Sequence, residues 1–285
     1  MIKQLNSHII INGDDFGMSP GTNRAIESLH QQGRLTSASI LANMPWSEEA
    51  FVYAKTAVSL HVGIHLNLTT GRPVLPAAQV PTLVTTDGSF YDMPALLSRL
   101  FAGRLQRSEI RAELDAQIKT CLENGLRPRH IDCHMHFHAV PILGDLVSRL
   151  ATHYGITAVR NPNFSAFVIP PLRSRLIDDT LRKSGFNVLK STENLLARKG
   201  IALNAPANRS DHMLYLRWCV EGDSDTSAAF RACINRTENQ TLEIIAHPAM
   251  LDDVLPQLSN YVNGRQQELA FLSSDQFLQL INTER

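Results

Sequence analysis

Hydrophobic and polar positions in the first 160 residues follow two alternating patterns. Short apolar or β-branched runs are typical of strands, whereas apolar residues three and four positions apart are typical of helices. These patterns predict strands at 7–12, 37–41, 62–68 and 130–138 (the last with its exit loop) and helices at 20–32, 46–55, 108–124 and 142–154. Repeated strand–helix alternation indicates parallel strands with helices packed outside them.

The pattern weakens between about residue 161 and residue 240, where Pro170-Pro171 interrupts it. We interpret 161–240 as a variable insertion or lid region. A buried strand at 242–246 and a closing helix at 274–281 follow. Polar motifs fall at the C-terminal ends of several strands, which favours a deformed TIM-barrel-like (β/α) barrel over a doubly wound α/β sheet. We find no internal repeat or linker, and we expect a single domain over 1–285.

The amino-acid composition limits the kinds of binding partner and the cellular compartment that we expect for the protein. Basic and acidic residues are equal at 27 each, and the absence of a strongly basic stretch argues against nucleic-acid binding. No apolar run of about 18 residues predicts a membrane span, and the N-terminal residues lack a signal-peptide pattern. The four cysteines are far apart, which is typical of reduced thiols, so we expect a cytoplasmic protein. A homodimer is left open.

Two adjacent carboxylates, Asp14 and Asp15, follow the first predicted strand in the segment Asn-Gly-Asp-Asp-Phe-Gly. Neighbouring side chains of a regular strand point to opposite faces, so both can face one cavity only where the backbone bends. Like charges at this distance are costly unless a cation neutralises them or one is protonated. The alternative is a structural role, in which these residues and Ser19 cap the following helix.

A second cluster contains four of the 11 histidines within nine residues. Its polar members are spaced two apart at the end of a strand: His130, Asp132, His134, His136 and His138. Imidazole is a common ligand of zinc and other divalent metals. Histidines two positions apart on a strand converge only partly on one ion, so we expect one or two ligands, with the others orienting ligands or binding substrate. A solvated polar face is the alternative.

Two further histidines lie at predicted strand ends. His61 and His65 have the spacing of a helical zinc pair, but the glycine and β-branched residues between them indicate a strand. His65 is at its C-terminal end, where an internal site belongs, and His61 is expected at the surface. His247 directly follows the strand 242–246 and is a candidate acid, although alone it would be read as a core or loop residue.

Four motifs together resemble the YdjC-like carbohydrate deacetylases, a family that includes chitooligosaccharide and hopanoid-associated deacetylases. They are N-x-D-D-F-G near the N-terminus, G-I-H at 63–65, H-I-D-x-H-x-H-x-H at 130–138 and A-H-P-A at 246–249. The resemblance runs from about residue 9 to residue 250 and weakens between 161 and 240. It implies a deformed barrel-like fold, one divalent metal ion and an N-acetylated sugar as substrate.

The resemblance also assigns roles by position. It implies that Asp14 is the general base, that Asp15, His65 and His134 are the metal ligands, and that His247 is the general acid. His61 matches no ligand position, although the more distant NodB-type deacetylases use two histidines four apart. Arg160, at the end of a strand-like segment, is a candidate for a catalytic role in which it keeps Asp14 ionised.

These roles are chemically consistent with amide hydrolysis. An Asp-His-His triad leaves coordination positions open for water and for the acetyl oxygen, and it tolerates zinc or magnesium. The substrate is left open between an oligosaccharide and a glycolipid head group. Two other functions stay open as well: a histidine-rich barrel metallophosphoesterase, which would gather more ions, and a carbohydrate-binding protein without catalysis.

Overall fold

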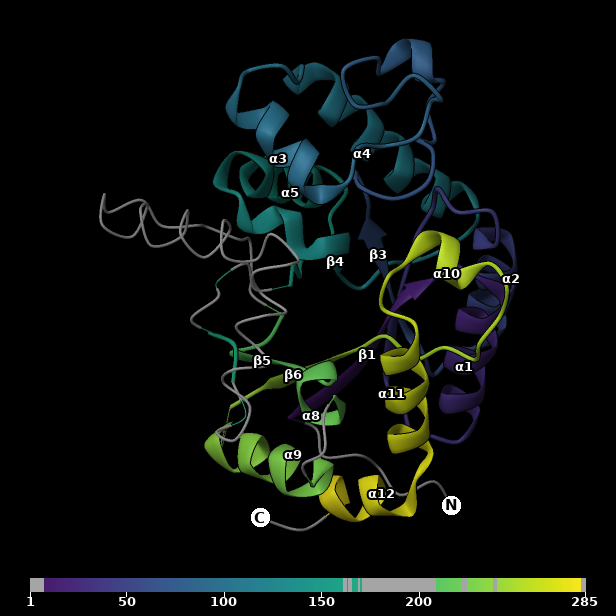
Figure 1. Cartoon of the computed structure of the whole chain (residues 1–285), viewed down its shortest axis with the longest axis vertical. Coiled ribbons are helices and arrows are strands. Elements are labelled where there is room, and N and C mark those ends of the chain that lie inside the picture. The colour runs from purple at the N-terminus through teal and green to yellow at the C-terminus, as the bar shows by residue number, and fades with distance from the viewer. Residues whose placement is uncertain are drawn as a thin grey trace.

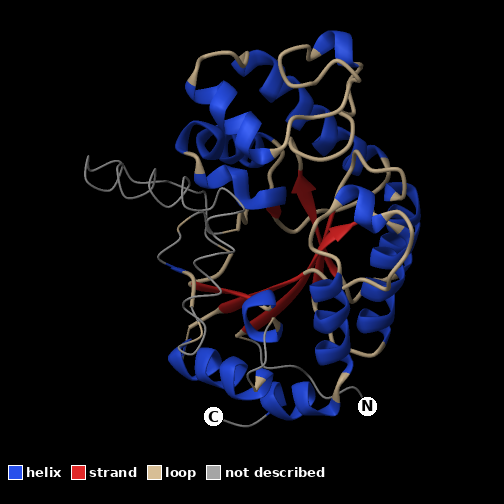
Figure 2. Cartoon of the chain, in the orientation of Figure 1, coloured by secondary structure: helices blue, strands red, loops and turns tan. Residues whose placement is uncertain are grey.

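Six parallel strands form one sheet in the order β4-β3-β2-β1-β6-β5, curled into a half-barrel (Figure 2). The computed structural model describes residues 8–160, 163, 166–168, 170, 209–221, 225–237 and 240–282. The strands are β1 (Ile9–Phe16), β2 (Ser37–Ile40), β3 (His61–Leu66), β4 (Ile131–Cys133), β5 (His212–Tyr215) and β6 (Leu242–Ala246). The predicted single-domain, deformed TIM-barrel-like α/β fold is therefore confirmed.

The centre of the sheet is buried on both faces. All residues of β2 and β6 are buried, and β1 is buried except at Ile10. Such continuous burial is typical of parallel sheets that helices cover. Short bridges continue the curl beyond the two edge strands, because Val159 pairs with Ile131 of β4 and Phe167 pairs with Met213 of β5.

Helices cover the outside of the curled sheet (Figure 1). Those described are α1 (Pro20–Gln31), α2 (Ser47–Thr56), α3 (Met93–Phe101), α4 (Arg107–Glu123), α5 (Pro141–His153), α8 (Arg217–Val220), α9 (Thr226–Ile234), α10 (Leu255–Leu258), α11 (Asn263–Ser273) and α12 (Asp275–Asn282). Helices α1, α2, α4, α5 and α12 match the sequence prediction to within a few residues, whereas α3, α8, α9, α10 and α11 were not predicted. In the described part of the chain, no helix combines the length and apolar character needed to cross a membrane.

The histidine-rich segment differs from its prediction. Strand β4 ends at Cys133, and residues 134–139 form a tight 3₁₀ segment in which Met135 and His136 have left-handed φ angles of 54° and 55°. The histidines at 134, 136 and 138 therefore do not share one face of a strand. Side chains two positions apart share a face only in an extended strand, and this relationship is lost where the backbone leaves that conformation.

The range 161–240 contains more of the core than expected. Residues 212–215 form β5 of the sheet and residues 226–234 form helix α9, which packs against α12. For the rest of that range the interpretation as an insertion or lid stays a prediction, because residues 171–208 lie outside the described part of the chain.

Candidate functional site

Asp14 and Asp15 reach the same cluster because strand β1 is irregular where they lie. The register between β1 and β2 shifts between Gly13 and Phe16, and Asp15 has a left-handed φ of 65°. Both carboxylates thereby approach one nitrogen, His65 Nε2, at 4.0 Å from Asp14 Oδ2 and 3.3 Å from Asp15 Oδ1. The bend that the adjacent aspartates required is present.

Helix capping does not explain the aspartate pair. Ser19 is the N-cap of α1, and its side chain accepts a hydrogen bond from the backbone N–H of Thr22. The carboxylates of Asp14 and Asp15 instead bind buried arginine and histidine side chains. Of the proposed cap residues, only Ser19 therefore has that role.

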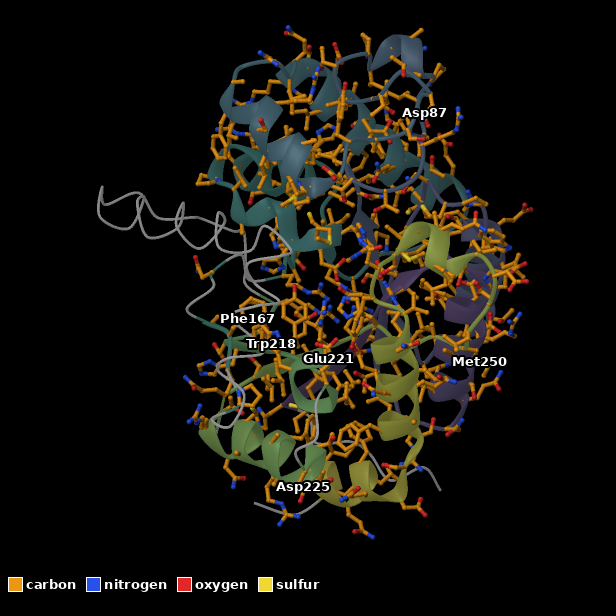
Figure 3. All side chains as sticks on the ribbon, viewed as in Figure 1. Asp87, Phe167, Trp218, Glu221, Asp225 and Met250 are labelled. Atoms are coloured by element: carbon orange, nitrogen blue, oxygen red, sulfur yellow. The ribbon has the colours of Figure 1, made fainter. Side chains whose placement is uncertain are left out.

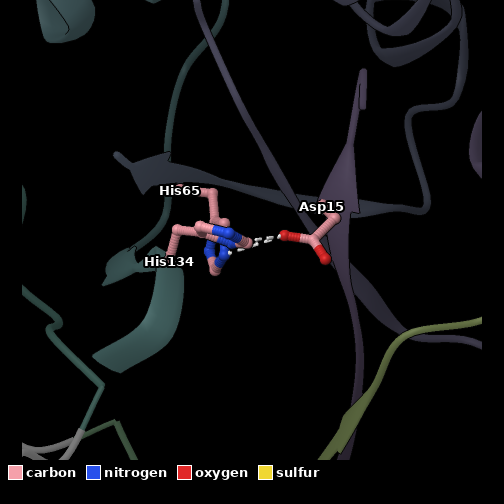
Figure 4. Close-up of side chains that lie close together, drawn as sticks. All are labelled: Asp15, His65 and His134. Atoms are coloured by element: carbon pink, nitrogen blue, oxygen red, sulfur yellow. Dashed lines mark hydrogen bonds and ion pairs between the residues drawn. The ribbon is translucent and has the colours of Figure 1, made fainter. Parts of the chain in front are cut away.

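Asp15, His65 and His134 bring three potential ligand atoms together. Figure 4 shows the two rings converging on the carboxylate, with His134 Nδ1 at 2.8 Å and His65 Nε2 at 3.3 Å from Asp15 Oδ1. One donor atom from each residue lies within 4.8 Å of the others, and all three residues are buried. Two imidazoles and a carboxylate form an established donor set for divalent metals. The residues fit such an ion and could hold it.

Asp132 orients His65. Its Oδ1 lies 2.6 Å from His65 Nδ1, so the opposite nitrogen, Nε2, faces Asp15. A carboxylate behind a histidine is the usual outer partner of a metal-binding imidazole. Burial lowers the pKa of His65, but Asp132 and Asp14 outweigh that effect and raise this pKa to about 10.

The other two potential ligands are also fixed from behind. Arg265 Nη2 lies 2.6 Å from Asp15 Oδ2 and leaves Oδ1 facing the histidines. His134 Nε2 hydrogen-bonds to the hydroxyl of Thr70 at 3.1 Å, which turns Nδ1 towards Asp15. Burial alone would raise the pKa of Asp15. The charges of His134 and Arg265 outweigh that effect, so the pKa of Asp15 lies well below its ordinary value.

Arg160 joins three buried carboxylates next to the triad. It binds both oxygens of Asp14 at 2.7 Å, Asp132 Oδ2 at 2.8 Å and Glu243 Oε1 at 2.8 Å. Two parallel N–H···O bonds give strong and geometrically specific ion pairing. Burial raises the pKa of Asp14, but the charge of Arg160 opposes this and the net pKa is lowered. Asp14 is therefore held as an ionised carboxylate.

A second group of three, Asp14, His65 and Asp132, also satisfies the distance requirement for a cation. Both of its carboxylates are already bound to the guanidinium of Arg160. The positive charge that this group needs is therefore supplied by the arginine, and Asp15, His65 and His134 are the better metal site.

His247 lies on the other side of Asp14, directly after strand β6. Its Nε2 is 3.9 Å from Asp14 Oδ2, and its ring stacks on Tyr215 with centroids 6.0 Å apart. Burial has the largest effect on the pKa of His247 and lowers it to about 4. The charges of Asp14 and Asp15 oppose this effect.

Aromatic rings continue from His247 along strand β5. Tyr215 stacks on Phe167 at 4.9 Å, and both contact Trp218. Figure 3 shows Phe167 and Trp218 next to each other. This aromatic wall was not predicted from the sequence, because Tyr215 and Trp218 lie in the range interpreted as an insertion.

His130 is a packing residue. A Cβ added at Gly63 would lie 2.2 Å from its ring, so the imidazole covers the glycine of the Gly-Ile-His motif. Burial lowers the pKa of His130 to about 4. Its Nε2 is 3.6 Å from Asp132 Oδ2, and His130 belongs to neither candidate metal group found among the described residues.

The other histidines lie outside the triad as well. His138 Nε2 hydrogen-bonds to the backbone carbonyl of Arg160 at 3.2 Å, and the ring of His136 packs 4.4 Å from that of His138. His61 is exposed at the start of β3. The structure thus brings together Asp14, Asp15, His65, His134, Arg160 and His247 and leaves the remaining histidines to packing or to the surface.

Helix α11 contributes two charged residues that the sequence analysis missed. Arg265 binds Asp15, and Glu268 accepts a hydrogen bond from the backbone N–H of His247. Both are buried although they are charged and lie in a helix with few apolar positions. The i, i+3 spacing of Arg265 and Glu268 on one helical face was the available signal, but it is common on solvated helices.

A curled parallel sheet whose strand ends meet at a buried Asp-His-His cluster defines a barrel-type α/β protein with a candidate metal centre. Residues 8–283 match the family model described as YdjC-like protein, and the chain belongs to that family. The resemblance inferred from the four motifs is thereby confirmed.

Relatives of similar length support this assignment. The chain is 33% identical over 267 residues to a carbohydrate deacetylase of Geobacillus stearothermophilus, covering 93% of this chain and 89% of that one. It is 31% identical over 265 residues to a carbohydrate deacetylase of Halalkalibacterium halodurans, covering 93% and 94%. A crystal structure from Enterococcus faecalis, provisionally assigned to a cellobiose-phosphate cleavage protein, matches with a TM-score of 0.72 at 27% identity and covers 96% and 93%.

Proposed function

We propose that the protein is a metal-dependent carbohydrate N-deacetylase, which hydrolyses the acetamido group of an oligosaccharide or a glycolipid head group. Membership of the YdjC-like family and relatives named carbohydrate deacetylase support the reaction class. The observation that carries the proposal is the position of Asp14, next to the Asp15-His65-His134 triad and 3.9 Å from His247. A base, a metal site and an acid thus adjoin one another.

The proposed ligands are Asp15, His65 and His134. An ion bound there would polarise the acetyl carbonyl and lower the pKa of water from about 15.7 towards about 7. Zinc and magnesium are both compatible with this donor set. Arg265, Asp132 and Thr70 hold the three side chains in place.

Asp14 is proposed to take the proton from the attacking water. The two bonds from Arg160 keep this carboxylate ionised and fix its direction. His247 is proposed to give a proton to the sugar nitrogen as the C–N bond breaks, so that the product leaves as a neutral amine. The separation of 3.9 Å between Asp14 Oδ2 and His247 Nε2 supports the proposal that both groups act on one amide.

The test is acetate release from a panel of N-acetylated sugars. N-acetylglucosamine, short chitooligosaccharides and an N-acetylated glycolipid head group are offered to the metal-loaded protein, whose metal content is measured. Release from at least one sugar that is lost in Asp14→Asn supports the proposal. No release from any sugar, with a full complement of metal, contradicts it and favours a carbohydrate-binding protein without catalysis.

The phosphoesterase alternative is tested in the same assay. The Enterococcus faecalis neighbour is provisionally assigned to cleavage of a sugar phosphate. Hydrolysis of 4-nitrophenyl phosphate with two or more metal ions per chain would favour this reading. The binding of Arg160 to both Asp14 and Asp132 argues against a second ion among the described residues.

Location and assembly are further parts of the proposal. We propose a cytoplasmic protein, in keeping with four buried cysteines that form no disulfide, Cys121, Cys133, Cys219 and Cys233. We also propose a homodimer, which a measurement of the mass of the protein in solution tests.

A further inference from the structure

Glu268 is a fully buried carboxylate that faces the imidazole of His247. Its Oε2 accepts a hydrogen bond from the backbone N–H of His247, and its Oε1 accepts one from the hydroxyl of Tyr261 at 2.6 Å. The same Oε1 lies 3.9 Å from His247 Nδ1. His247 Nδ1 is buried and has no hydrogen-bond partner among the described residues. The imidazole thus lies between Glu268 on its Nδ1 side and Asp14 on its Nε2 side.

A packing role alone does not account for a carboxylate at this position. Burying an ionisable group costs free energy, and a neutral glutamine side chain could form hydrogen bonds to the same two groups. Burial raises the pKa of Glu268 to about 7, against the opposing effects of Tyr261, the backbone N–H of His247, Arg265 and Arg217. The group that gains from a negative charge here is a protonated His247.

We propose that Glu268 is a positioning residue for His247, which it holds through Nδ1 so that the proton on Nε2 points towards the leaving amine. This inference rests on the proposed deacetylase function. In the step, the C–N bond breaks, its electron pair stays on nitrogen, and the proton moves from His247 Nε2 to that nitrogen. His247 becomes neutral with its remaining proton on Nδ1, facing Glu268. Glu268 takes part as the carboxylate that it forms above its pKa of about 7, and it neither gains nor loses a proton in the step.

Several charged or titratable groups surround this pair and enter its pH dependence. Those facing Glu268 are Tyr261, Arg265 and Arg217, and those facing His247 are Asp14, Asp15, Arg265, His65, Tyr215 and Tyr261. The test therefore changes only the charge of Glu268. Glu268→Gln keeps the size of the side chain, its carbonyl can accept the backbone N–H, and its amide can donate to the tyrosine hydroxyl.

The direct readout is the titration of His247, followed by NMR at its Cε1–H in the zinc- or magnesium-loaded full chain. Glu268 lies 3.9 Å from Nδ1 and has a pKa of about 7, so its ionisation is expected to shift the His247 resonance in a step near pH 7 in the wild type. This step is expected to be lost in Glu268→Gln, which does not titrate. The matched control is Glu113→Gln on α4, because Glu113 is also fully buried and accepts backbone N–H groups, from Val74 and Leu75. It is expected to leave the His247 titration unchanged.

A second variant tests the same contact without removing the carboxyl group. Tyr261→Phe keeps the ring but removes the hydroxyl that binds Glu268 Oε1. Because that hydrogen bond lowers the pKa of Glu268, its loss is expected to move the step in the His247 titration to higher pH. If Glu268→Gln fails to fold, Tyr261→Phe decides the question alone. A His247 titration that moves in neither variant overturns the proposal.

Kinetics connect the pair to the reaction. Glu268→Gln is expected to lower kcat on the N-acetylated sugar about 10- to 100-fold with KM unchanged. 4-Nitrophenyl acetate, whose leaving group needs no proton, is expected to lose much less. Equal losses on both substrates indicate a structural role and overturn the proposal. If no sugar is deacetylated but the His247 titration moves as expected, the proposed function fails and the coupling of Glu268 to His247 stands.

Discussion

Arg160 binds Asp14 through both carboxylate oxygens, each at 2.7 Å, and all of these atoms are buried. A planar guanidinium matches a carboxylate in this two-bond geometry and fixes its orientation. The same arginine also binds Asp132, which in turn orients His65. Arg160 thereby links the proposed base to one of the proposed metal ligands.

Replacement of Asp14 tests its role as the base. Asp14→Asn removes the proton acceptor but keeps the shape of the side chain, so kcat for acetate release is expected to fall about 10²- to 10⁴-fold. The metal content is expected to be unchanged, because Asp15, His65 and His134 are retained. Acetate release and metal analysis on the same preparation check this. Wild-type kcat in the variant would exclude Asp14 as the base.

Replacement of Arg160 tests the energetic role of the buried ion network. Arg160→Met leaves Asp14, Asp132 and Glu243 without their shared partner. Removing one member of a buried ion pair leaves an uncompensated charge, so the free energy of unfolding is expected to fall by about 3–5 kcal/mol. Urea unfolding followed by circular dichroism measures this difference.

The control for that experiment is an exposed arginine. Arg107 binds Asp145 at 2.9 Å, and the two side chains are 57% and 45% exposed. Solvent screens such a pair, and Arg107→Met is expected to cost less than about 1 kcal/mol. Equal losses in the two variants would show that the network around Arg160 has no special stabilising role.

The sequence was informative where local pattern determines structure. The apolar run before Asp14 and Asp15 predicts a strand, and the two charges indicate the bend that the register shift after Gly13 provides. The spacing of His61 and His65 around Gly63 was correctly interpreted as a strand, with His65 buried at its end and His61 exposed at its start. Here strand period and strand direction are sufficient to place side chains.

The sequence was uninformative where tertiary contacts override local preference. Met135 and His136 adopt left-handed φ angles that residues other than glycine rarely take, so no local rule predicts the turn that ends β4. Arg265 is separated from Asp15 by 250 positions, and no pattern within helix α11 reveals that it binds a carboxylate of β1. Buried ion pairs of this kind depend on the assembled fold.

The raised pKa of Glu268 predicts a pH-dependent stability. The folded chain keeps this proton up to about pH 7, whereas the unfolded chain releases it near the ordinary value of 4.5. Between these values the folded state binds more protons, so the contribution of Glu268 to the free energy of unfolding falls as pH rises. Glu268→Gln does not titrate and lacks this term.

The stability difference between wild type and Glu268→Gln isolates that contribution. The free energy of unfolding of the wild type minus that of the variant is expected to fall by more than about 1 kcal/mol between about pH 5 and about pH 7. Above that range the difference is expected to be constant. Urea unfolding of both proteins in the same metal-loaded state measures it. A constant difference across the whole range would mean that the carboxyl group has an ordinary pKa in the folded protein.

Metal affinity distinguishes residues that support the triad from a residue that resembles a ligand only in the sequence. Asp132 contacts His65, whereas His61 is exposed. Asp132→Asn removes the charge 2.6 Å behind His65 Nδ1 and is expected to weaken zinc binding about 10- to 100-fold. His65→Ala removes a ligand and is expected to lose binding. His61→Ala changes an exposed side chain and is expected to bind as wild type does. Titration calorimetry compares the three, and weakened binding in His61→Ala would favour the histidine pair of the more distant NodB-type deacetylases.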